Sequence, residues 1–144
     1  MRRTARALVL AMAVSALISA PALAGPGGAA AVPLNNGQET TDAKFGGSGS
    51  FSWWVDGGEL CYDLSVKRLT SAPWGAHIHG LAGRHEDAGV VVALVPPSGA
   101  TGTSSACVAV EAGLLAAIVA NPRDYYVNVH TTAFPGGEVR GQLK

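Results

Sequence analysis

Three of the four histidines in the chain occur in a pattern that can bind a metal ion. His77 and His79 lie two residues apart in "WGAHIHG", so on a β-strand their side chains would point to the same side. His130 lies in "DYYVNVHT", where strand alternation places it on one face with Tyr126 and Asn128. Two histidines from one strand and a third from another are a recurrent way to hold copper or zinc through imidazole nitrogens. The pattern predicts a mononuclear site if the two strands are neighbours.

A structural role for the same histidines is the alternative. Their rings could form hydrogen bonds to backbone or carboxylate groups and so fix the ends of strands. A closed metal site also needs a fourth ligand. The loop after His79 contains His85, Glu86 and Asp87, which could fold back as ligands or stay in solvent.

Arg140 is a charged candidate for the same face. It lies two residues after Glu138 in the closing segment "EVRGQL", so the two side chains would share a strand face and form an exposed ion pair. Arg140 could instead reach the histidines and contact an anion.

The common catalytic motifs do not occur in the sequence. "GGSGS" lacks the final glycine of a nucleophile elbow. The glycines of the same segment precede a strand pattern and not a helix, so they do not predict a phosphate-binding loop. We therefore predict no catalytic residues and favour a protein that is not an enzyme.

Alternating apolar and polar residues predict that the histidines lie on short β-strands. Ser48–Val55 and Glu59–Val66 flank Asp56-Gly57-Gly58, which is a strong hairpin signal. Further strand patterns are "AHIHG", "GVVVALV", "ACVAV", "DYYVNVHT" and "EVRGQL", while "SGATGTSS" indicates a loop and "EAGLLAAIVANP" one short helix. Seven or eight strands with one short helix predict an all-β sandwich or small barrel.

The N-terminal residues 1–24 predict a secretory signal peptide. A head with three arginines precedes an uncharged apolar run, and Ala22-Leu23-Ala24 is a small-residue cleavage pattern. The apolar run is too short to span a membrane, so we expect a secreted mature chain without a membrane span. Residues 25–31 predict a flexible leader, and residues 32–144 one domain.

Cys61 and Cys107 are the only cysteines, and in an exported protein they predict a disulfide. Cys61 alternates with the apolar residues Leu60 and Tyr62, so the bridge would lie on the outer face and hold a loop or an edge strand. Closing a loop of about 47 residues stabilises the fold by about 4 kcal/mol at most. Two buried free thiols are the alternative.

The charge of the mature chain argues against two kinds of partner. The signal peptide would remove three of the ten basic residues and none of the ten acidic ones, which leaves a formal charge of −3. A negative chain lacks the basic patch that nucleic acids or anionic membranes require. We expect neither as a partner.

Several of these segments resemble the CHRD domain, which is named after chordin and also occurs in exported bacterial proteins. The resemblance rests on "AHIHG", on "VVVALV" and above all on "YYVNVHTTAFPGGEVRGQL", and it extends over residues 32–144. It implies an all-β, immunoglobulin-like barrel or sandwich with a distant likeness to copper–zinc superoxide dismutases. It implies no established activity.

The dismutase likeness implies roles for individual residues. His77 and His79 resemble the pair of copper histidines on one dismutase strand, and His130 resembles the histidine from a late strand. Arg140 resembles the arginine that guides anions. The loop with His85 and Asp87 is short and lacks the further zinc histidines, so the likeness implies a mononuclear site at most.

The sequence therefore predicts a secreted CHRD-domain protein that acts as a non-catalytic binding or structural module. Its partner would be an unknown extracellular protein or ligand, and it would need no cofactor. The alternative is a copper- or zinc-binding protein that uses His77, His79 and His130, with dismutase-like chemistry.

Overall fold

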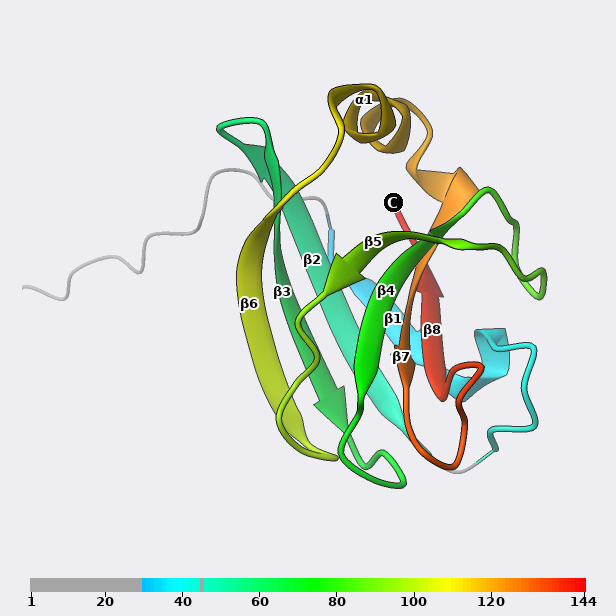
Figure 1. Cartoon of the computed structure of the whole chain (residues 1–144). Helices are drawn as coiled ribbons and strands as arrows, with labels where there is room; N and C mark the ends of the chain where they lie inside the picture. The colour runs from blue at the N-terminus through cyan, green and yellow to red at the C-terminus, as the bar shows by residue number, and fades with distance from the viewer. Residues whose placement is uncertain (1–29, 45) are drawn as a thin grey trace, which may run out of the picture.

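The strand patterns form one antiparallel sheet in the computed structural model, which describes residues 30–44 and 46–144. The sheet order is β5-β4-β7-β8-β1-β2-β3-β6. The strands are β1 Val32–Asn35, β2 Ser48–Asp56, β3 Glu59–Lys67, β4 Gly75–Gly80, β5 Val90–Leu94, β6 Gly102–Ala109, β7 Tyr125–His130 and β8 Val139–Gln142. The sheet curls into a nearly closed barrel (Figure 1), so the predicted all-β fold with one short helix is confirmed.

One α-helix and two short 3-10 turns accompany the sheet in the described residues. The helix α1 (Ala112–Ala120) covers one end of the barrel (Figure 1), and two 3-10 turns, η1 (Asn36–Gln38) and η2 (Pro122–Asp124), precede loops or strands. Glu111 caps α1, because its carboxylate accepts hydrogen bonds from the backbone N–H groups of Gly113 and Leu114. Among the described residues, none of the helices has the length and apolar character needed to cross a membrane. The predicted signal peptide lies outside the described residues.

The apolar faces of the strands meet inside the barrel. On β3 the predicted core side chains are all buried: Leu60, Tyr62, Leu64 and Val66. On β4 and β7 the residues that alternate with the histidines are also buried, and they include Ala76, Ile78, Val127 and Val129. Because side chains alternate along a strand, this packing turns the polar residues of β4 and β7 to the outer face.

The two edge strands, β5 and β6, face each other across the seam of the barrel and are joined by side chains. The hydroxyl of Tyr62, on β3, accepts a hydrogen bond from the backbone N–H of Val95 at 2.7 Å. The hydroxyl of Ser104, on β6, donates to the carbonyl of Val95 at 2.7 Å. The barrel therefore closes at Val95 without a backbone ladder between its edges.

The predicted disulfide is present and lies between β3 and β6. Cys61 and Cys107 are direct partners in the register of the two strands, with their Cα atoms 3.9 Å apart. Since β6 pairs in the sheet only with β3, the bridge ties an edge strand to its neighbour, as the sequence predicted.

Candidate metal centre

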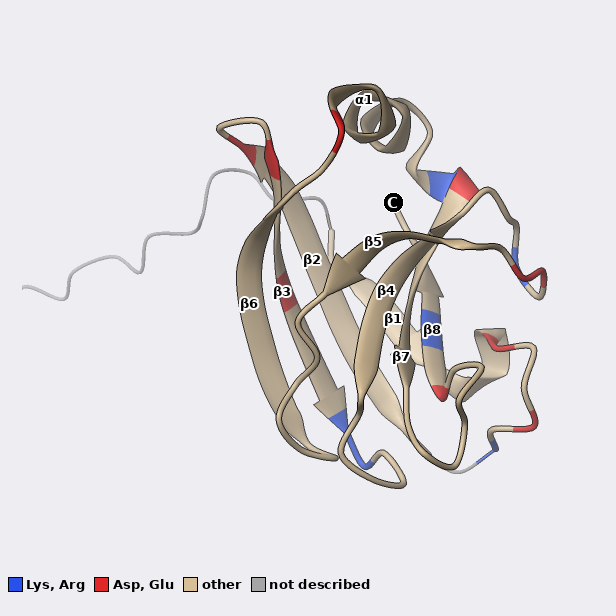
Figure 2. Cartoon of the chain, viewed as in Figure 1, with Lys and Arg blue, Asp and Glu red and all other residues tan. Residues whose placement is uncertain are grey.

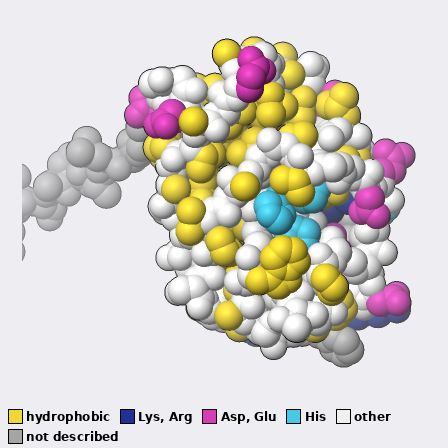
Figure 3. Space-filling model, viewed as in Figure 1, with side chains coloured by type: hydrophobic (Ala, Val, Ile, Leu, Met, Phe, Trp, Pro, Cys, Tyr) yellow, Lys and Arg dark blue, Asp and Glu magenta, His cyan; other side chains and the backbone are white. Residues whose placement is uncertain are grey.

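The three predicted histidines come together on the outer face of β4 and β7. The two strands are antiparallel neighbours, with Gly75 opposite His130 and His79 opposite Tyr126. One ring nitrogen of each histidine lies within 4.8 Å of those of the other two. The rings form one patch that is open at the surface between hydrophobic side chains (Figure 3).

Gly75 makes this close approach sterically feasible. A Cβ atom at this position would lie 3.1 Å from Cε1 of His77 and 3.7 Å from Cδ2 of His130. The glycine before the His-x-His pair therefore leaves room for the two rings from neighbouring strands to meet.

Backbone carbonyls determine which nitrogen of His79 and of His130 carries the proton. Nδ1 of His79 lies 2.9 Å from the carbonyl oxygen of Ala88, and Nδ1 of His130 lies 2.9 Å from that of Pro135. A carbonyl can only accept, so each Nδ1 donates its proton and each Nε2 carries a lone pair. Metal-binding histidines commonly use their second nitrogen in this way.

The Nε2 lone pairs of His79 and His130 have different surroundings. Nε2 of His79 is buried and has no hydrogen-bond partner among the described residues. Nε2 of His130 lies 2.9 Å from Nδ1 of His77, which donates to it in the absence of a metal. Because His77 is only half buried, its proton can move to the other ring nitrogen, and Nδ1 is then free as a ligand.

The three nitrogens lie farther apart than the ligands of one bound ion. In a tetrahedral site, nitrogens about 2.0–2.1 Å from the ion lie roughly 3.4 Å from one another. The observed upper distance of 4.8 Å exceeds this spacing by roughly 1.4 Å, so an ion would have to draw the rings together.

Burial keeps His77 and His130 in the neutral form that binds metals. It lowers the pKa of His130 to about 4, an effect that the Pro135 carbonyl opposes and that neighbouring His77 and His79 reinforce. Burial and the proximity of His79 also lower the pKa of His77. Both rings are therefore uncharged at neutral pH.

Trp74 forms one side of the histidine patch. Trp74 is 56% exposed, and its ring lies tilted against that of His130, with the ring centroids 5.2 Å apart. The other two tryptophans lie on β2, where Trp53 is buried in the core and Trp54 is half buried. Trp74 is therefore the tryptophan that a molecule at the histidines would contact.

The acidic residues of the loop between β4 and β5, called here the β4–β5 loop (residues 81–89), do not join the histidines. The carboxylate of Glu86 accepts a hydrogen bond from the backbone of Gly83 at 3.1 Å, and that of Asp87 accepts one from the hydroxyl of Thr40 at 2.8 Å. His85 is exposed. The groups that the described residues bring together as possible ligands are three histidines, which fits a mononuclear site.

The prediction of an exposed ion pair between Glu138 and Arg140 is wrong, because the two side chains are 1% and 0% exposed. Glu138 is surrounded by hydroxyl groups: its carboxylate accepts from Thr70 at 2.7 Å and from Thr131 at 2.6 Å. It also accepts from the backbone N–H of Thr70. The carboxylate is thus held by neutral donors, which satisfy it without a cation.

Arg140 is covered by the β4–β5 loop. Its two terminal nitrogens donate to the carbonyl oxygens of Glu86 at 2.8 Å and of Gly83 at 2.6 Å. Figure 2 shows a blue segment on β8, and the charged residues of the β4–β5 loop at the right of the view. A contact between Arg140 and an anion stays a prediction, and it would require the β4–β5 loop to open.

Glu39 is a second buried ionisable group on this side of the barrel. It is 7% exposed, and its Oε1 has no hydrogen-bond partner among the described residues. Burial raises the pKa of Glu39 to about 8, although the positive charge of Arg140 lowers it. At neutral pH the carboxyl group is therefore mostly protonated.

The raised pKa of Glu39 predicts how stability depends on pH. The folded state keeps this proton up to about pH 8, whereas the unfolded chain releases it near 4.5. The stabilisation is therefore complete below about pH 4.5 and is lost as the pH rises through 8. We expect the free energy of unfolding of the wild type, relative to Glu39→Gln, to fall by about 3–4 kcal/mol between pH 5 and pH 9. Urea denaturation at a series of pH values measures this difference, and parallel curves would contradict the assignment.

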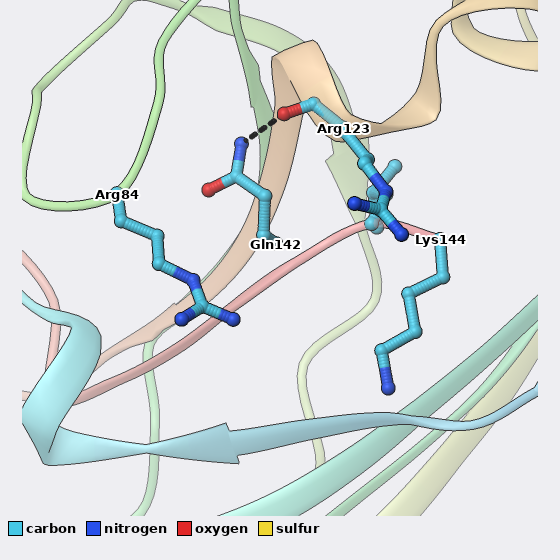
Figure 4. Close-up of a pocket in the computed structure, with 5 residues that line it drawn as sticks. Arg84, Arg123, Gln142 and Lys144 are labelled. Carbon is cyan, nitrogen blue, oxygen red and sulfur yellow. Dashed lines mark hydrogen bonds between the residues drawn. The ribbon is translucent and has the colours of Figure 1, made fainter.

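A separate pocket of about 360 Å³ lies near the C-terminal end of β8. Its lining includes three cationic side chains, those of Arg84, Arg123 and Lys144 (Figure 4). The amide of Gln142 forms part of the lining and donates to the carbonyl oxygens of Ala82 and Arg123, at 2.7 Å each. The pocket is distinct from the histidine patch, since the two share no residue.

Comparison with known proteins identifies the family of this chain. Neither a curated protein nor a solved structure matches it. The family model of the CHRD domain matches residues 30–143, which is nearly all of the described chain. A CHRD domain is consistent with a module of binding or structural type, and the disulfide fits an oxidising environment. The chain therefore belongs to the CHRD domain family.

Proposed function

We propose that this CHRD domain binds one copper or zinc ion through Nδ1 of His77 and Nε2 of His79 and His130. The observation that carries the proposal is the buried, unpartnered Nε2 of His79. A buried acceptor without a partner costs about 1–3 kcal/mol, and a purely structural role for the ring would leave this cost unexplained. A metal ion bound to the lone pair would remove it.

The three imidazole ligands favour a metal ion of intermediate softness, such as copper or zinc. Neutral imidazoles suit copper and zinc, and divalent copper binds a given set of nitrogen ligands more tightly than zinc. Three protein ligands leave a coordination position free, as in zinc sites that bind water or substrate. Trp74 is exposed and its ring lies beside that of His130, so it would contact a molecule that reached the histidines. Bound copper would supply one-electron chemistry and bound zinc a Lewis acid.

The disulfide and the predicted signal peptide support a site of action outside the cytoplasm. Disulfides persist in oxidising compartments, and the Cys61–Cys107 bridge is formed between paired strands. In such a compartment the domain would meet metal ions directly, as a binder of free or exchangeable copper or zinc.

Titration of the chelator-treated protein with Cu²⁺ and with Zn²⁺ tests this function. We expect one equivalent of metal to remain with the protein after gel filtration, measured by elemental analysis. Free metal at about 100 times the dissociation constant stabilises the fold by about 2.7 kcal/mol, so the unfolding midpoint should rise.

A protein without stoichiometric metal and with an unchanged midpoint would contradict the proposal. That result would favour the alternative, a non-catalytic binding or structural module. The cationic pocket with Arg84, Arg123 and Lys144 would then be the described surface that best fits an anionic partner.

A further inference from the structure

We propose that Arg140 is a positioning residue for His79: it holds the β4–β5 loop in the conformation that leaves the Nε2 lone pair of His79 free. The consequence for metal affinity rests on the proposed metal site. The hydrogen bonds and ring contacts that carry the inference are present without a metal.

The burial of Arg140 depends on the β4–β5 loop. A buried guanidinium group needs hydrogen bonds to offset its lost hydration. The nearest carboxylate oxygen, of Asp87, is 4.0 Å away on a side chain that is 71% exposed, so the ion pair is weak. The carbonyl oxygens of Gly83 and Glu86 are therefore the main partners of the cation. Arg140 and the folded loop stabilise each other.

The same loop determines the state of the His79 ring. Ala88 lies two residues after Glu86, and its carbonyl accepts the Nδ1 proton of His79 at 2.9 Å. The backbone N–H of Ala88 donates to the hydroxyl of Tyr126 at 3.2 Å, which holds the carbonyl in place from the side of β7. A loop released from Arg140 would move the acceptor of the Nδ1 proton.

Tyr126 links Arg140 and His79 by a second route. The Cζ atom of Arg140 lies 3.3 Å from the centroid of the Tyr126 ring. The ring of His79 is nearly parallel to the Tyr126 ring, at 6°, with centroids 4.8 Å apart. Because β7 lies between β4 and β8 in the sheet, Tyr126 has His79 on one side and Arg140 on the other. The guanidinium group therefore restricts the tyrosine ring against which His79 packs.

These contacts give Arg140 an effect on a nitrogen atom that it does not touch. Without the β4–β5 loop in place, the proton of His79 can occupy either ring nitrogen, and only one of the two forms presents Nε2 to the other histidines. Loss of an outer-shell partner of a metal-binding histidine typically reduces affinity by about 10–100-fold. We expect a loss of that size when Arg140 is replaced.

The first test needs no metal. Two-dimensional ¹H–¹⁵N spectra of the histidine side chains report which ring nitrogen is protonated. In the metal-free wild type we expect the proton of His79 on Nδ1, and in Arg140→Lys we expect a mixture of both forms. A wild-type His79 with its proton on Nε2, or an unchanged Nδ1 form in Arg140→Lys, would overturn the inference.

The second test compares copper affinities at a temperature well below the unfolding midpoints of all variants. We expect Arg140→Lys to bind one equivalent of Cu²⁺ with a dissociation constant raised about 10–100-fold. Arg123→Lys is the matched control, because this exposed arginine lies outside the network, and its affinity should equal that of the wild type. An Arg140→Lys variant with lower thermal stability and wild-type affinity would show that Arg140 is merely structural.

The outcomes separate this inference from the proposed function. A wild type that binds no metal contradicts the metal site, and the spectra still decide the role of Arg140. If Arg140 variants do not fold, Tyr126→Phe interrupts the same path, because it keeps the ring and removes the hydroxyl that holds Ala88. A Tyr126→Phe protein with His79 still wholly protonated on Nδ1 and with wild-type affinity would then exclude the route through the Tyr126 hydroxyl, and a wild-type His79 with its proton on Nε2 would overturn the inference.

Discussion

Replacing His79 with alanine is expected to abolish stoichiometric binding of copper or zinc, while replacing His85 with alanine leaves binding unchanged. Nε2 of His79 is buried and has no hydrogen-bond partner among the described residues, and one ring nitrogen of His79 lies within 4.8 Å of those of the other two histidines. His85 is an exposed histidine six residues further along the chain, in the β4–β5 loop. His79→Ala therefore removes an imidazole inside the candidate site, and His85→Ala removes one outside it.

The size of the effect follows from the number of ligands. Removal of one of three ligands should exceed the 10–100-fold loss that is typical of outer-shell partners. Metal at about 100 times the wild-type dissociation constant should raise the midpoint of the wild type and of His85→Ala by roughly 10 °C. The midpoint of His79→Ala should not move. Calorimetric titration and thermal unfolding with and without metal measure both quantities, and an equal response of the two variants would rule out His79 as a ligand.

Removal of the Cys61–Cys107 bridge is expected to have the largest effect on the stability of the metal-free domain. The two cysteines are 46 residues apart in the chain, and closing a loop of this length restricts the unfolded state. The bridge also holds β6, whose only partner in the sheet is β3. We expect the Cys61→Ala, Cys107→Ala double variant to lose about 2–4 kcal/mol of unfolding free energy.

Chemical denaturation of the double variant and of the reduced wild type measures this loss. The two proteins should unfold at similar denaturant concentrations, because both lack the same cross-link. If the double variant unfolded at the same concentration as the oxidised wild type, the bridge would contribute nothing to the fold. Because the histidines lie on β4 and β7, away from β3 and β6, the folded double variant should keep its metal affinity.

The face of each histidine could be predicted from the sequence because strand alternation has a period of two. Ala76 and Ile78 are apolar and occupy the core, so His77 and His79 must point outward. The cysteine pair was predictable for a different reason: a chain with two cysteines allows one pairing. In both cases the sequence needs no knowledge of the fold: alternation along one strand gives the direction of a side chain, and the presence of two cysteines gives their pairing.

The start of β6 was missed for a physical reason. Gly102–Ser105 belongs to the segment predicted as a loop, and this prediction is wrong, because these residues pair with β3 from Val66 to Asp63. Their side chains are small or polar, so the segment has no apolar periodicity. Backbone hydrogen bonds to β3 hold Gly102–Ser105 as a strand. The residues of β3 that pair with this segment leave no pattern in the sequence of the segment itself.

The burial of Arg140 could not be predicted from the sequence either. Its partners are backbone carbonyls of Gly83 and Glu86, more than fifty positions earlier in the chain. Every residue has a carbonyl group, so no side-chain pattern distinguishes the two that face the guanidinium group. The same holds for the acceptor of the His79 proton, the carbonyl of Ala88.

The disulfide and the candidate metal centre would cross-link the two ends of the sheet in different ways. At one end, β6 is joined to β3 by a covalent bond that stays closed in an oxidising environment. Near the other end, β4 and β7 share the histidines, and an ion there would form a reversible cross-link between the two strands. The rigidity of the half of the barrel that carries the histidines would then follow the local supply of metal, while the other half keeps its shape.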